Sequence, residues 1–275
     1  MKQRKLFCEI HPFAYMLSVK KERAKRRLTD LFAQTRFAKT KSEELLPVVV
    51  KKHQSLIRRK LNNVEIQLQE NKAKNLSIAA PKVTNIQIKP GETFSFWKLV
   101  GGAFARKGYL PGVVISGGKP SSGIGGGLCQ FTNLLHWMIL HTDLDIVEHH
   151  HHNGVDLFPD FKRQLPFGAG TSIVYNYLDY RAQNNTDRVY QIIVYTTAEY
   201  LCGEIRCSEP LPIKVHIHEE DAYFYEQGGD MIRHNKIYRR VIDKRSGNTV
   251  EDVLLLENHA VVMYDRALIP LCQQH

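Results

Sequence analysis

Cysteine is scarce in this sequence of 275 residues, which contains five, at positions 8, 129, 202, 207 and 272. The odd count and irregular spacing exclude a small secreted scaffold held together by disulfides and indicate reduced thiols. The role of each cysteine must therefore be judged from its own surroundings.

Long hydrophobic runs are also absent, and no stretch reaches the roughly 18 apolar residues of a transmembrane helix. The first apolar segment, residues 6–19, is interrupted by Glu9, His11 and Pro12 and has no small-residue cleavage site. We therefore expect a cytoplasmic protein without a transmembrane segment, for which peripheral contact with a membrane stays open. With 43% hydrophobic residues, the chain can still bury a sizeable core.

Positive charge is concentrated near the N-terminus, where residues 1–75 contain 19 Lys and Arg but only 7 Asp and Glu. The residue pattern predicts one helix at 13–37 and a second at 42–61, which Ser42 caps and Pro47 limits. Such a basic arm suits an anionic surface, whether nucleic acid, an acidic membrane or another protein, although a solvated helical face explains the same charges.

Short alternating runs and Pro-Gly or Gly-Gly turns begin near residue 75 and predict strands. We divide the chain into a basic helical region at 1–74 and a second domain at 75–275. Strands are expected at 170–181 and 189–197, joined as a hairpin, and in the segments IKVHIHEE and VEDVLLLENHAVVMY. The predicted fold class is α+β: a basic N-terminal helical arm, then a mostly antiparallel β domain with one central helix at 128–141.

Glycines precede Cys129 in the segment GIGGGLCQFTNLLHW, at the start of the predicted central helix. Free N–H groups and the macrodipole at a helix N-terminus favour a thiolate. Gly125, Gly126 and Gly127 would also offer backbone N–H groups to an oxyanion. A cysteine nucleophile needs a base, and the segment VEHHHHNG supplies Glu148 and four histidines.

Two other interpretations of this segment remain open. Cys129 can be a small buried residue beside solvated histidines, since cysteine is among the most buried residue types. It can also bind zinc with two of His149–His152, although the sequence has no Cys-x-x-Cys spacing. Elsewhere, Cys202 and Cys207 are expected to be packed thiols, and Asp179 either faces solvent or orients a partner within a site.

Four segments resemble the VanW family: IKPGETFSFWKLVG, GGGLCQFTNLLHWMIL, VEHHHHNGVDLFPDF and YNYLDYRAQNNT. The resemblance extends from about residue 75 to 205. Family members resemble one another in a Gly-Gly-Gly-x-Cys-Gln turn, a Glu followed by two histidines, and an Asn-Asn-Thr after a strand. In this sequence these features are Gly125–Gln130, Glu148 with His150 and His152, and Asn184–Thr186.

The resemblance implies a link to glycopeptide resistance and to peptidoglycan. Some secreted members are associated with L,D-transpeptidation, in which a cysteine thiolate attacks the carbonyl of a stem peptide. By this resemblance Cys129 is the nucleophile, and His152 or His150 is the general base that Glu148 orients. Substrate contacts are expected from Gly125, Gly126, Gly127, Gln130 and Asp179.

The sequence therefore predicts a Cys-dependent acyl transferase or hydrolase that acts on peptidoglycan precursors or stem peptides and needs no metal or cofactor. One alternative is a non-catalytic accessory protein that binds a cell-wall precursor or enzyme. A second alternative is a protein that binds an anionic polymer or nucleic acid through its basic N-terminal helices.

Overall fold

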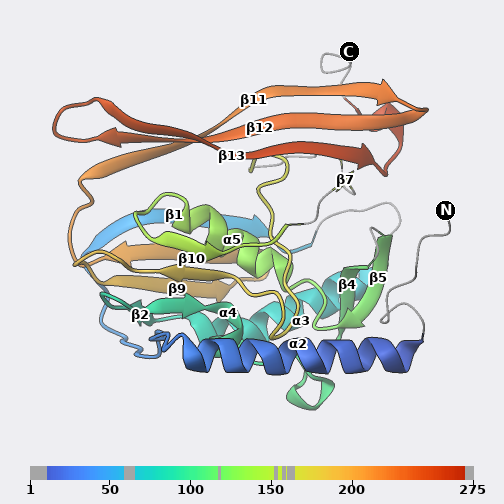
Figure 1. Cartoon of the computed structure of the whole chain (residues 1–275), viewed down its shortest axis with the longest axis horizontal. Coiled ribbons are helices and arrows are strands. Elements are labelled where there is room, and N and C mark those ends of the chain that lie inside the picture. Colours follow the sequence, from blue (N-terminus) through green and yellow to red (C-terminus); the bar gives the residue numbers. More distant parts are fainter. Residues whose placement is uncertain are drawn as a thin grey trace.

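The computed structural model describes residues 11–58, 66–116, 119–151, 154–156, 159 and 165–269. Two four-stranded sheets, two smaller sheets and several helices make up the fold (Figure 1). The helices are α2 (Pro12–Phe32), α3 (Ile66–Val83), α4 (Phe96–Val100) and α5 (Cys129–Ile139), with the 3-10 turns η1 (Ala105–Lys107) and η2 (Arg266–Leu268). This architecture confirms the predicted α+β class with mostly antiparallel strands.

The main core lies against an antiparallel sheet with the strand order β1-β10-β9-β2. Its strands are β1 (Val48–Leu56), β10 (Tyr200–Cys207), β9 (Tyr190–Thr196) and β2 (Ile86–Ile88). Ile192, Val194 and Ile205 alternate along β9 and β10 and are fully buried. α3 packs against β9, whereas α5 packs against β10 and β1. Gly203 of β10 permits this close approach, because a Cβ there would lie 2.6 Å from Leu134 of α5.

A second sheet has the strand order β11-β12-β13-β7. The long strands β11 (Ile213–Gln227), β12 (Asp230–Asp243) and β13 (Thr249–Val262) are antiparallel, and the short β7 (Val155–Asp156) runs parallel to β13. Figure 1 shows β11 to β13 as a separate layer over α5. Arg239 of β12 joins the layers, because its guanidinium donates to the carbonyls of Leu140 and Thr142 just after α5.

Two small sheets position the segments that the sequence singles out. One has the order β3-β8-β6, formed by β3 (Thr93–Ser95), β8 (Arg181–Gln183) and β6 (Asp145–Glu148), and the other is the hairpin of β4 (Pro111–Ser116) and β5 (Lys119–Ile124). The glycine turn follows β5 and leads into α5, while the run of histidines follows β6.

The N-terminal region differs from its prediction in one element. α2 confirms the first predicted helix, but the second is wrong, because residues 48–56 form β1 and pair with β10. Three β-branched valines after Pro47 favour extended backbone. The edge of β10 then supplies the hydrogen bonds that a strand needs.

The expected boundary after residue 74 lies inside α3. Asn75 is fully buried in that helix and donates hydrogen bonds to the carbonyls of Leu110 and Gly126, both at 2.9 Å. Val48 and Val50 of β1 and Ala73 of α3 pack against the same core as the rest of the chain, so the structure is continuous across residue 75.

The hairpin predicted between residues 170 and 197 does not form. Residues 170–180 contain only an isolated bridge between Val174 and Leu178, while β8 pairs with β3 and β6, and β9 pairs with β2 and β10. The strands predicted in IKVHIHEE and VEDVLLLENHAVVMY are confirmed as β11 and β13.

Candidate functional site

Cys129 is the first residue of α5, directly after the glycine turn, as predicted. Burial raises the pKa of its thiol, and hydrogen bonds from the N–H groups of Ile173 and of Cys129 itself offset only part of that effect. The net direction is opposite to the depressed pKa expected for a cysteine at a helix N-terminus. Burial of the sulfur therefore outweighs the hydrogen bonds that it accepts.

The glycines of the turn allow the backbone at residues 125–127 to pack closely against neighbouring segments of the chain. Gly125 and Gly127 have φ of +77° and +92°, a region that other residues rarely adopt. Gly126 lies against the backbone of Gly112, where a Cβ on Gly126 would come within 2.1 Å of a carbonyl carbon. The N–H groups of Gly125 and Gly126 already donate to the carbonyls of Leu110 and Gly123. These two donors are therefore engaged by the fold, contrary to the oxyanion role expected of them, whereas that of Gly127 stays a prediction.

A strip of polar side chains runs along α5 from Cys129. The hydroxyls of Thr132 and Thr171 are hydrogen-bonded to each other, and Asn133 Oδ1 accepts from both the N–H and the hydroxyl of Thr171, at 2.6 and 2.8 Å. These residues are not among the site residues expected from the sequence. The sequence did contain a sign of this polar strip, because Thr132, Asn133 and His136 lie on one face of a mostly apolar helix.

His149 packs against His136 two turns beyond Cys129. The rings are stacked with centroids 4.1 Å apart, and His149 Nε2 lies 3.1 Å from the carbonyl of Gly170. His136 Nδ1 lies 3.2 Å from the hydroxyl of Tyr180. Burial lowers the pKa of His149 to about 4 and holds that of His136 well below its usual value. Seven residues of helix place the backbone of His136 about 10 Å along the axis from that of Cys129.

Of the two histidines expected to serve as the base, only His150 is described. His150 points to Glu148, with Nε2 3.0 Å from Oε1, whereas His149 and His151 lie together with ring centroids 5.2 Å apart. Alternation thus directs His149, not His150, towards α5. His152 lies outside the described residues. Within the part of the chain that the structure describes, no histidine ring is hydrogen-bonded to the Cys129 sulfur.

Glu148 is the centre of an ionic network. Burial raises the pKa of its carboxyl, but hydrogen bonds from Arg26, the Asp179 N–H and His150 outweigh burial, so the pKa is below its usual value. Arg181 Nε is 3.4 Å from Glu148 Oε2. The acidic residue of the family-like motif therefore contacts a histidine, as expected, and also ties α2 to the body of the protein.

Asp179 and Gln130, expected to contact substrate, both have partners within the fold. Asp179 is 2% exposed and accepts hydrogen bonds from the Trp97 N–H and from Arg181 Nε, at 3.0 and 2.9 Å. It therefore does not face solvent, and the expectation that it orients a partner within a site stays a prediction. Gln130 Nε2 donates to the Ser55 hydroxyl at 2.8 Å and so links α5 to β1.

A cavity of about 380 Å³ lies between the end of α5, β6 and the second sheet. It is lined by apolar side chains such as Leu144 and Val241 and by charged ones such as Asp143, Arg239 and Glu251. A cavity of this size and mixed lining suits a small polar ligand. The sequence does not predict this cavity, because its two walls come from segments about 100 residues apart.

Metal ligands are grouped elsewhere in the described residues. His234, Glu257 and His259 form a cluster on β12 and β13 that does not include Cys129. The zinc alternative for Cys129 therefore gains no support from the described geometry.

Comparison with known proteins places these features in a family. A family model described as "VanW like protein" matches residues 71–206. The chain is 30% identical to Vancomycin B-type resistance protein VanW of Enterococcus faecalis, over 83% of this chain and 82% of that protein. It is also 30% identical to Uncharacterized protein YoaR of Bacillus subtilis, over 42% of this chain and 36% of that protein.

No solved structure matches significantly. Among the described residues, no helix combines the length and the apolar character needed to span a membrane. The family match includes the glycine turn, Cys129 and the histidine run, and the relative from Enterococcus faecalis is similar over most of its length. The chain belongs to the VanW family.

Proposed function

We propose that this protein is an accessory factor of vancomycin resistance that binds a peptidoglycan precursor peptide without turning it over. The resistance context is supported by the similarity to Vancomycin B-type resistance protein VanW, which covers most of both chains. The non-catalytic role is supported by the surroundings of Cys129. This residue is only partly exposed, burial raises the pKa of its thiol, and the N–H groups of Gly125 and Gly126 are already bonded.

The cavity beside the end of α5 is the binding place in this proposal. Stem peptides carry an amine, and the cavity offers to it the carboxylate of Glu251, which is about half exposed. Asp143 and Arg239 also line the cavity, but both already have partners in the fold, Asp143 in Arg188 and Arg239 in the carbonyls of Leu140 and Thr142. Arg239 also bonds to Glu251, with the nitrogen and oxygen 3.2 Å apart. Its charge is therefore held in place at the cavity.

Glu251 and Asp252 provide a matched test of this binding place. Each is paired with an arginine of β12, Glu251 with Arg239 and Asp252 with Arg240, but only Glu251 lines the cavity. Binding of a fluorescent synthetic stem pentapeptide is measured by anisotropy. We expect Glu251→Ala to weaken binding about tenfold, which corresponds to ~1.4 kcal/mol, and Asp252→Ala to leave it unchanged.

Two other results would contradict this proposal. If the wild-type protein does not bind the peptide, the proposed function is wrong. If both variants bind as tightly as the wild type, the peptide binds elsewhere and the cavity assignment is wrong.

Cys-dependent acyl transfer is the second candidate, and two observations favour it. The Cys129 sulfur accepts a hydrogen bond from the Ile173 N–H. In the described structure, Nδ1 of His151 is buried and has no hydrogen-bond partner. In this reaction the thiolate attacks a peptide carbonyl, a thioester forms and the amine leaves with a proton from the base. Intact mass spectrometry after incubation with the stem peptide would then detect an acyl adduct in the wild type and in Cys202→Ala, but not in Cys129→Ala.

A further inference from the structure

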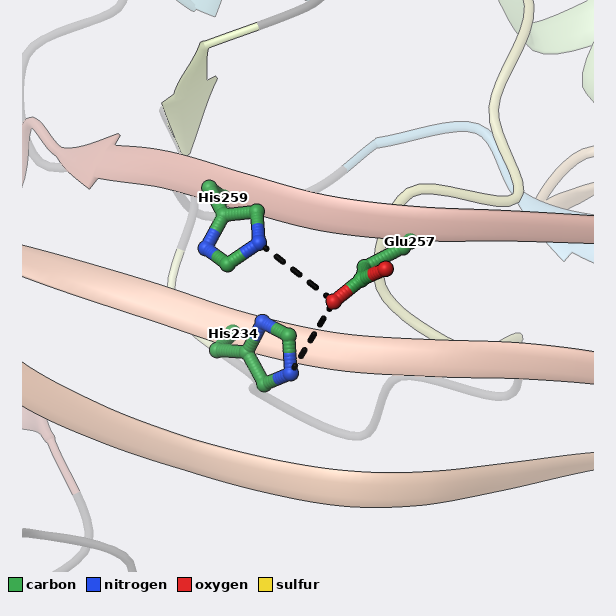
Figure 2. A group of neighbouring side chains, drawn as sticks. All are labelled: His234, Glu257 and His259. Atoms are coloured by element: carbon green, nitrogen blue, oxygen red, sulfur yellow. Dashed lines mark ion pairs between the residues drawn. The ribbon is translucent and has the colours of Figure 1, made fainter.

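Three potential metal ligands converge across β12 and β13, away from the α5 region. His234 of β12 is directly opposite His259 of β13, and Glu257 lies two residues before His259 on the same face of the sheet. Figure 2 shows the three side chains pointing towards one another. Glu257 Oε1 is 3.9 Å from His234 Nε2 and 3.6 Å from His259 Nε2, and all three ligand atoms lie within 4.8 Å of one another.

The second nitrogen of each ring faces an oxygen atom. His234 Nδ1 lies 3.0 Å from the carbonyl of Asn258, which can only accept, so neutral His234 carries its proton on Nδ1. Nε2 is then left with a lone pair that faces Glu257. His259 Nδ1 lies 3.4 Å from the hydroxyl of Tyr225. Histidines that bind metals in proteins usually have this arrangement, because the outer hydrogen bond fixes the ring and its tautomer.

The neighbouring cation does not occupy the cluster. Lys236 is paired in register with Glu257, but its ammonium lies 2.8 Å from Asp221 on β11. The carboxylate of Glu257 therefore stays directed to the two histidines.

We propose that His234 Nε2, His259 Nε2 and Glu257 bind one Zn²⁺ ion. Bonds of about 2.0–2.2 Å in tetrahedral geometry separate ligand atoms by roughly 3.4 Å. The two distances from Glu257 are within about 0.5 Å of this value, and the two histidine nitrogens, which lie within 4.8 Å of each other, approach it by rotation of the exposed His259 ring. Two imidazoles and one carboxylate suit zinc better than Mg²⁺ or Ca²⁺, which prefer all-oxygen ligands.

The exposure of the three ligands places this site at the surface of the sheet. The side chain of His234 is 4% exposed, whereas those of Glu257 and His259 are 43% and 54% exposed. The ion would thus link β12 to β13 from the surface and leave its fourth position to water. This inference is independent of the proposed function, because none of the three ligands lines the cavity.

The test is titration of the metal-free protein with Zn²⁺, measured by calorimetry. A second titration uses Co²⁺, whose visible absorption reports four-coordinate geometry. Loss of an outer-shell partner typically weakens metal binding about 10–100-fold, so we expect loss of a ligand in Glu257→Gln or His259→Gln to weaken binding more than 100-fold. Both residues are exposed, and unfolding of the metal-free variants checks that they remain folded.

His218→Gln is the matched control. This histidine of β11 in the same sheet also has a glutamate neighbour, with His218 Nε2 3.2 Å from Glu220 Oε1, but it lies outside the cluster. We expect unchanged zinc affinity in this variant, and an unchanged affinity in His151→Gln, which tests the histidine run. The proposal is overturned if the wild type binds no zinc, or if Glu257→Gln and His259→Gln bind it as tightly as the wild type.

Discussion

Arg26 and Glu148 form a two-pronged ion pair between α2 and the end of β6, although 122 residues separate them in sequence. Arg26 Nη1 is 2.6 Å from Glu148 Oε2, while Nη2 bonds to Oε1 and to the carbonyl of Tyr177. Both side chains are largely buried, at 20% and 12% exposure. The basic charge of α2 is thus used partly within the molecule, as well as on its outer face.

We expect Arg26→Ala to reduce the free energy of unfolding by about 2 kcal/mol, because it leaves the Glu148 carboxylate largely buried with one fewer charge partner. Urea unfolding measures the change. The exposed neighbour Arg27 provides the control, and Arg27→Ala should change stability by less than about 0.5 kcal/mol. Equal effects of the two substitutions would show that the ion pair does not stabilise the docking of α2.

The stability of the protein should fall on acidification through the window set by His149. Its pKa is about 4 in the folded protein because of burial, against about 6.5 in the unfolded chain. The folded state therefore favours neutral His149, so this contribution is complete above pH 6.5 and is lost as the pH falls towards 4. Urea unfolding across this range should give a shallower pH dependence for His149→Gln than for the wild type. An identical dependence in the two proteins would contradict the assignment.

Cys129 should react slowly with iodoacetamide in the native protein, because its thiol is buried and its pKa is raised. Cys202 is a residue of the same intermediate exposure as Cys129 and therefore provides the reference, and it should react faster at neutral pH. Mass spectrometry of labelled peptides gives both rates, and labelling in urea provides the unfolded reference. This expectation reverses the one drawn from the sequence, in which Cys129 is the activated thiol. If Cys129 is labelled first at neutral pH, the acyl-transfer candidate moves ahead of the binding role.

Gly126→Ala should destabilise the fold by about 3 kcal/mol or more, since its Cβ would meet the backbone of Gly112, which cannot rotate away. Gly170→Ala is the control, because a Cβ there meets only Asn133 at 3.6 Å and the backbone has no positive φ. Thermal unfolding compares the two variants. A small effect at Gly126 would mean that the turn can separate from β4, which would restore a substrate-binding role for its backbone.

The sequence alone was sufficient for features that depend on local periodicity and turn chemistry. Regular spacing of apolar residues after a glycine turn determined that α5 begins beside Cys129, and alternating apolar residues determined β11 and β13. The order of motifs also identified the family, because the glycine turn, the histidine run and Asn184–Thr186 are local in sequence.

Only the tertiary structure decided which of these residues meet. Residues 48–56 form a strand because they pair with the edge of β10. His149 rather than His150 lies towards α5, because His150 is hydrogen-bonded to Glu148, which also pairs with Arg26. The sequence could not place His234 opposite His259, since that contact depends on the register between two long strands. Local preference acts over a few residues, whereas register, burial and the pairing of distant charges are determined by packing of the whole chain.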